Sequence, residues 1–147
     1  MAAFHTQVHA VQKYRLGKEE KDVQGNTWKY LKGITSLVAY DAVTFDELGV
    51  TALLAANAIG PVAFAGATID AATKFGWFGV EGKFTANMVA NSADNTRIGR
   101  ETTDGKVGDG RAAGDEIYNC VARSATTAAA TGTVQCYRPF VDDANGA

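Results

Sequence analysis

The two histidines of the chain, His5 and His9, are the first residues to examine for chemistry. In an extended strand they would share one face and could supply two ligands to a metal ion, but no third ligand accompanies them. Both lie in the N-terminal segment, so a Ser-His-Asp or Cys-His arrangement is not expected. No phosphate-binding or dinucleotide-binding fingerprint is present either. We therefore predict no catalytic residue, no metal site and no cofactor.

Several acidic residues are candidates for a catalytic or a calcium-binding site. Asp41, Asp46 and Glu47 could be the paired carboxylates of a glycosidase, although acids at strand ends are commonly just solvated. The stretch 104–110, Asp-Gly-Lys-Val-Gly-Asp-Gly, faintly resembles a calcium-binding turn but lacks the ligand spacing of an EF-hand. We interpret it as an ordinary surface turn.

Cys120 and Cys136 fall on two successive predicted strands, and their spacing fits no zinc pattern. Two alternatives stay open for this pair. A cross-strand disulfide could join them, or they could be buried free thiols. A chain made in a reducing cytoplasm usually keeps such thiols free.

Length and composition limit the fold that must position these groups. A chain of 147 residues builds one compact domain, and 46% apolar with 20% charged residues is the balance of a folded protein. Sixteen glycines, only two prolines and abundant Ala, Thr and Val favour short strands joined by glycine turns. No stretch is apolar enough for a membrane helix, and no secretion signal is recognised. We predict an all-β fold with at most one short helix and no membrane partner.

The charge is unevenly distributed along the chain. Residues 1–32 hold six Lys or Arg against three Asp or Glu, whereas the remainder is net acidic. Acidic residues interrupt the basic ones, and no glycine-aromatic platform accompanies them, so nucleic acid is not expected as a partner. The basic segment instead favours an acidic protein surface.

The pattern along the chain divides it into three parts. Residues 1–25 have no clean apolar face and are predicted to be an extended arm, 26–139 a β-rich domain, and 140–147 a short acidic tail. The expected strands of the domain include 27–32, 37–40, 60–66, the glycine-aromatic segment 74–84, a separate strand 86–90, and a final antiparallel hairpin of 116–123 with 133–138. Pro139 is expected to end that hairpin. Glycines at 76, 79 and 82 predict a bulge, a bend or a close approach within the glycine-aromatic strand.

Four segments in this order resemble the small decoration, or cement, proteins of tailed phages. They are Thr27-Trp-Lys-Tyr30, Leu37-Val-Ala-Tyr-Asp41, Gly60-Pro-Val-Ala-Phe64 and Gly76-Trp-Phe-Gly-Val-Glu-Gly82, followed by Tyr137-Arg-Pro139. The resemblance implies a β-barrel, β-tulip-like or sandwich domain that does no chemistry. It implies a structural virion protein, made in the host bacterial cytoplasm, that binds the major capsid protein on the outer capsid surface, often as a homotrimer.

Two groups of residues are expected to carry this role. The arm would supply the contacts with the capsid or with neighbouring subunits, through His5, Val8, Val11, Lys13, Tyr14, Arg15 and Lys18. Four aromatic residues would be core or interface anchors: Trp28, Tyr30, Trp77 and Phe78. The alternatives are another phage head or tail structural protein, or a glycan-binding or host-surface-binding module that uses the Trp and Tyr side chains as a platform beside acids.

Overall fold

The structure is a computed structural model that describes residues 4–109 and 116–142. Within these ranges one short 3-10 helix, η1 (Phe4–Thr6), precedes eleven strands that belong to a single sheet. The strands are β1 (Val8–His9), β2 (Glu19–Lys21), β3 (Thr27–Lys32), β4 (Ala42–Phe45), β5 (Thr51–Leu53), β6 (Gly60–Ala65), β7 (Phe75–Met88), β8 (Arg97–Arg100), β9 (Val107–Gly108), β10 (Glu116–Ala122) and β11 (Ala130–Val141). The all-β prediction is therefore confirmed, as is the limit of one short helix.

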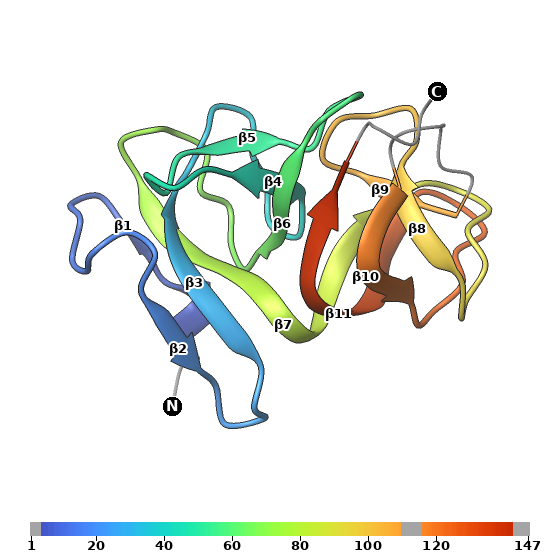
Figure 1. Cartoon of the computed structure of the whole chain (residues 1–147), viewed down its shortest axis with the longest axis horizontal. Helices are drawn as coiled ribbons and strands as arrows, with labels where there is room; N and C mark the ends of the chain where they lie inside the picture. Colours follow the sequence, from blue (N-terminus) through green and yellow to red (C-terminus); the bar gives the residue numbers. More distant parts are fainter. Residues whose placement is uncertain (1–3, 110–115, 143–147) are drawn as a thin grey trace.

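The long strand β7 organises the sheet and runs across the middle of the molecule (Figure 1). Its first part pairs with β1 and β3, its middle with β3 and β6, and its last part with β11. Further pairings link β7 through β9, β8 and β10 back to β11, so these strands close a ring. Four of the five segments that resemble decoration proteins lie in β3, β6, β7 and β11, which meet at β7.

Both faces of β7 are buried between Gly76 and Val80, which explains why aromatic residues are adjacent in this part of its sequence. Successive side chains of a strand point to opposite faces. Trp77 enters a large cluster with Trp28 and Tyr30, whereas Phe78 enters a second cluster with Leu31. Of the two interpretations that the sequence allowed for Trp28, Tyr30, Trp77 and Phe78, the structure places all four in the core.

The glycine-aromatic segment is a bulged strand in which a neighbouring ring comes close. The register with β3 shifts where Thr27 faces Glu81 and Trp28 faces Gly79. A Cβ atom on Gly79 would collide with the ring of Phe84. The predicted bulge and close approach are therefore confirmed. β7 continues without a break to Met88, so the separate strand expected at 86–90 does not exist.

The structure lacks one expected strand and moves the expected end of the last one. Residues 37–40 form a turn because Ser36 and Tyr40 adopt positive φ angles of 73° and 75°, which a strand cannot accommodate. The final strand passes through Pro139 to Val141, because the proline lies in a bulge where Asn119 opposes residues 137–139, and a bulge requires no ladder bond from it. Phe140 and Val141 thus belong to the sheet, and residues 143–147 of the predicted tail lie outside the described residues.

The close approach of Gly79 and Phe84 can be tested by mutation. We expect Gly79→Ala to lower the free energy of unfolding by about 1–3 kcal/mol through overpacking, although alanine is normally preferred to glycine in a strand. Adding Phe84→Leu should relieve part of this cost, so the double variant should be more stable than the sum of the two single effects. Denaturant unfolding of all four proteins measures this coupling, and strictly additive effects would contradict it.

Candidate functional site

The N-terminal segment of residues 4–16 lies on an aromatic shelf of the domain and does not project from it. The ring of Phe4 meets that of Trp77 edge-on at 5.0 Å, and the His5 imidazole stacks on Trp28 at 4.2 Å. Gly66 permits this approach, because a Cβ atom there would collide with the His5 carbonyl oxygen. The structure therefore differs from the expected extended arm, since aromatic contacts hold a segment whose polarity alone predicted a free one.

The second histidine is held by the same shelf. Nδ1 of His9 lies 2.9 Å from the hydroxyl of Tyr30, and the Tyr14 ring packs edge-on against the Tyr30 ring at 5.2 Å. Burial lowers the pKa of His9, and the Lys13 charge lowers it further. Burial also lowers the pKa of His5, with a smaller opposing effect from Asp22. Both rings are therefore neutral at pH 7 and act as aromatic packing groups here.

The remaining predicted contact residues form an exposed strip beside the shelf. Val11, Lys13 and Arg15 are exposed, with Val11 at 75%, and Val8 is partly exposed although its backbone pairs with β7. Lys18 lies over the Tyr14 ring at 4.4 Å and forms an ion pair with Glu20. The structure thus brings His5 and Tyr14 onto the shelf and leaves an apolar and basic strip available to a partner.

A charged clamp that the sequence did not predict ties β2 to the bulge of β11. Both terminal nitrogens of Arg138 donate to the Glu19 carboxylate at 2.7 Å, and Lys29 lies 3.2 Å from the same carboxylate. These cations, Arg138 first, lower the pKa of Glu19 to about 2. Arg138 reaches this position from a left-handed backbone conformation with φ of 48°. A residue pair 119 positions apart leaves no local sequence pattern, so only the fold reveals it.

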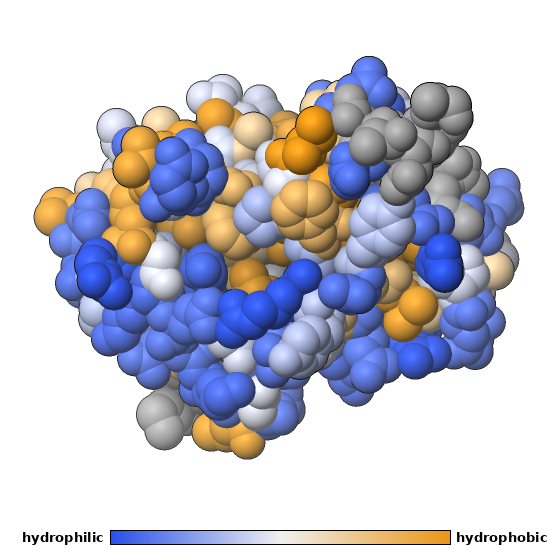
Figure 2. Space-filling model, in the orientation of Figure 1, coloured by the Kyte–Doolittle hydropathy of each residue, from blue (hydrophilic) through white to orange (hydrophobic). Residues whose placement is uncertain are grey.

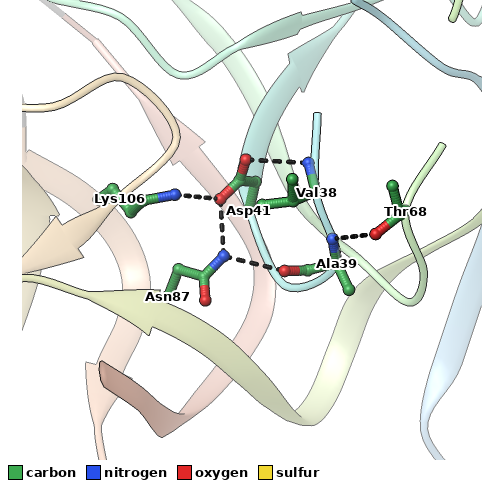
Figure 3. A network of polar contacts seen from close by, with 6 residues as sticks. All are labelled: Val38, Ala39, Asp41, Thr68, Asn87 and Lys106. Atoms are coloured by element: carbon green, nitrogen blue, oxygen red, sulfur yellow. Dashed lines mark hydrogen bonds and ion pairs between the residues drawn. The ribbon is translucent and has the colours of Figure 1, made fainter. Parts of the chain in front are cut away.

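A second polar network surrounds Asp41 (Figure 3). The carboxylate is 2% exposed and accepts hydrogen bonds from Lys106 at 2.8 Å, Asn87 at 2.7 Å and the Val38 backbone at 3.2 Å. Asn87 also donates to the Ala39 carbonyl oxygen at 2.9 Å. One buried carboxylate therefore joins the 37–41 turn to β7 and to the residue before β9.

Asp46, Asp104 and Asp109 also have local structural partners. Asp46 accepts backbone hydrogen bonds from Leu48 and Val50, which close the turn after β4. Asp104 pairs with Arg100, and Asp109 accepts the Ala93 backbone N–H, so the calcium-like stretch is a tied surface turn; its Gly110 lies outside the described residues. No cluster of three or more metal-ligating side chains occurs among the described residues.

The face shown in Figure 2 carries the exposed apolar residues of greatest interest. Apolar surface gathers where β6 and β11 run side by side. Ile59 is 63% exposed and precedes β6, and Phe140 is partly exposed opposite Pro61. A hollow of about 500 Å³ beside them is lined by Ile59, Pro61 and Phe45, with Lys29 and Asp46 also in its wall. We call Ile59, Pro61 and Phe140 the apolar patch.

A separate groove of about 550 Å³ follows the β10–β11 hairpin. Tyr118 and Tyr137 line it together with charged side chains of both signs, and Cys120 and Cys136 contribute to its lining. Tyr137 is 66% exposed.

Comparisons with protein-family models, curated proteins and solved structures find no match to this chain. In the described ranges, no helix has the length and apolar character needed to cross a membrane.

The Asp41 network predicts a clear stability effect. Asp41→Asn removes the anion facing Lys106 in a buried setting, so we expect the free energy of unfolding to fall by about 2–3 kcal/mol. Asp70→Asn is the matched control, because its pair with Lys74 is exposed on both sides and should leave stability unchanged within error. Equal effects of the two substitutions in denaturant unfolding would show that the network does not stabilise the fold.

The clamp predicts a pH dependence. The Glu19 carboxyl has a lowered pKa in the folded chain, so its stabilisation is complete above its ordinary pKa of 4.5 and is lost as the pH falls toward about 2. Glu19→Gln should therefore lower the free energy of unfolding by about 1 kcal/mol at pH 7, after allowance for solvent screening, and by almost nothing near pH 2.

Glu20→Gln is the control, because the Lys18–Glu20 pair is more exposed than the clamp. Denaturant unfolding at intervals from pH 7 to pH 2 measures both variants against the original chain. A Glu19→Gln deficit that stays constant over this range would exclude the ionised clamp as its cause.

Proposed function

We propose that this chain is a structural virion protein that binds the outside of an assembled phage capsid and stabilises it. The observation that carries the proposal is the apolar patch, in which Ile59 and Phe140 lie exposed beside the half-buried Pro61, with charged side chains nearby. Apolar clusters rimmed by polar residues are typical of protein-binding surfaces. The expected partners are the major capsid protein and further copies of this chain, in a trimeric arrangement.

The exposed strip supports the same proposal with a different physical contribution. Val11, Lys13 and Arg15 form an apolar and basic stretch, which suits an acidic protein surface. Charges at the rim of an interface chiefly accelerate association and lose influence in salt, whereas buried apolar contacts slow dissociation. A shell repeats its binding sites, so modest affinity at each site suffices for stable coverage.

The arrangement around β7 is the second line of support. The Trp-containing segment of β3, the Gly-Pro segment of β6, the Gly-Trp segment of β7 and the Tyr-Arg-Pro segment of β11 all meet at one strand. These are the segments that resemble decoration proteins. Their assembly into one structural unit favours a common fold over a chance sequence order.

A glycan-binding module is the second candidate, and the structure changes where it would bind. Trp28 and Trp77 are buried and offer no exposed platform. The groove of the β10–β11 hairpin offers Tyr118 and Tyr137 instead, beside carboxylate and guanidinium groups. Binding of soluble glycans that is lost on Tyr137→Ala, without capsid binding, would favour this candidate.

Capsid binding can be measured by co-sedimentation with assembled capsids prepared without this protein. We expect Ile59→Glu to weaken binding at least about tenfold at both low and high salt, because it places a charge in a desolvated contact. Lys13→Glu combined with Arg15→Glu should weaken binding at low salt and have a much smaller effect at high salt.

Val23→Glu serves as the control, because Val23 is 99% exposed in the turn between β2 and β3, away from the patch. It should bind as the original chain does. Binding of the original chain to no capsid would refute the proposed function, and full binding of Ile59→Glu would refute the role of the patch.

A further inference from the structure

The two cysteines occupy a position that the proposed function does not explain. Cys120 in β10 and Cys136 in β11 are Cα partners in the antiparallel hairpin, and both side chains are buried as free thiols. Free cysteines commonly pack in cores, but here two thiols oppose each other directly across a strand pair. The pair is therefore a candidate for covalent chemistry.

Backbone geometry already suits a bond between them. Directly opposed residues of an antiparallel pair have Cα atoms about 4.5–5.5 Å apart, within the range of about 4.4–6.8 Å found for disulfides. Side chains of directly opposed residues lie on the same face of a sheet, and both thiols are buried on that face, so they lie next to each other. Closing a disulfide here requires rotation of side chains and no rearrangement of the hairpin.

The pair lies next to a groove but is itself buried, with Cys120 4% and Cys136 5% exposed, so its reaction with an oxidant should be slow. Both cysteines contribute to the lining of the groove along the β10–β11 hairpin, beside Tyr118 and Tyr137. The hydrogen bond with Cys136 and burial raise the pKa of the Cys120 thiol well above its usual value. Little thiolate is then present at pH 7, so the pair oxidises slowly. It stays reduced in a reducing compartment, where any disulfide that forms is reduced again.

We propose that Cys120 and Cys136 are a covalent locking site, which forms a cross-strand disulfide by exchange with small-molecule disulfides after the chain leaves a reducing compartment. That sequence of compartments rests on the proposed function, because a virion is assembled in the cytoplasm and then released. The disulfide itself depends only on the hairpin.

The exchange is balanced with oxidised glutathione as the disulfide. The thiolate of one cysteine attacks a sulfur of oxidised glutathione, which forms a mixed disulfide and expels one glutathione thiolate. The thiolate of the other cysteine then attacks the protein sulfur of that mixed disulfide and expels the second glutathione. Each expelled thiolate takes up one of the two protons that the cysteines lose. Two protein thiols are oxidised, and one glutathione disulfide is reduced to two thiols.

The bond would fix the part of the molecule that carries its exposed surface. It would join β10 to β11 beside the bulge. Arg138, which pairs with Glu19, lies in this bulge, and Phe140 of the apolar patch follows it. The bond would also close the chain between residues 120 and 136, which reduces the entropy of the unfolded state. The expected result is a hairpin that resists opening on a released particle.

The test uses the full chain, incubated with oxidised glutathione at pH 8 or kept in dithiothreitol. We expect the thiol count, measured after denaturation, to fall from two to none and the intact mass to decrease by about 2 Da. Peptide mapping should join the fragments that contain Cys120 and Cys136. Thermal unfolding should occur about 5–10 °C higher in the oxidised chain.

Cys136→Ser is the control, and it should show no internal disulfide and no rise in Tm on oxidation. Two free thiols that persist in the original chain, glutathione adducts that do not resolve, or bonds only between chains would each overturn the proposal. Capsid co-sedimentation of the oxidised and reduced chains separates the two proposals. Disulfide formation without capsid binding would refute the proposed function alone, and capsid binding without a disulfide would refute the lock alone.

Discussion

The pairing of β7 on both edges, together with the burial of both faces between Gly76 and Val80, is the constraint on which the rest of the structure depends. A strand in this position must give its hydrogen bonds to several partners in succession, and β7 does so with β1, β3, β6 and β11. Aromatic side chains on opposite faces, Trp77 and Phe78, fill the two clusters that these partners enclose. Gly79 gives the Phe84 ring room on one of those faces. β7 thus contributes to both hydrophobic clusters, so its sequence must place apolar side chains on both faces.

Side-chain hydrogen bonds and ion pairs stabilise the irregular segments of the chain. The 37–41 turn has backbone hydrogen bonds to Ala65 and Asn87, and the Asp41 carboxylate fastens it further through the side chains of Lys106 and Asn87. The bulge of β11 is fastened in the same manner by Arg138 and Glu19. Each carboxylate binds groups from elements distant in sequence, and the loss of either one removes an ion pair between such elements. The two networks therefore have a structural role that resembles that of disulfides in smaller domains.

Sequence patterns predicted what depends on local alternation and failed where distant residues decide. The strand of 27–32 has the predicted bounds, although it is not half-buried as expected, because Leu31 enters the second cluster on its other face. The glycine-bounded strand of β6 was predicted within one residue. The turn at 37–40 was missed because its apolar residues resemble those of a strand. Leu37 is fully buried although it belongs to a turn. Both polar networks escaped prediction, because nothing near Asp41 indicates Lys106 and nothing near Glu19 indicates Arg138. The described part of the expected arm was misjudged for the same reason, since Trp28 and Trp77 supply its binding shelf.

The burial of the aromatic anchors also limits how the molecule can bind a partner. Trp28, Tyr30 and Trp77 are used by the core and by residues 4–16, so an interface has to be built from other residues. The apolar patch lies where β6 pairs with the C-terminal end of β11. β11 also belongs to the hairpin that contains Cys120 and Cys136. Contacts made through ordered strands lose little conformational entropy on binding. A rigid hairpin is therefore the physical link between the stability of this domain and any surface that it presents to a shell.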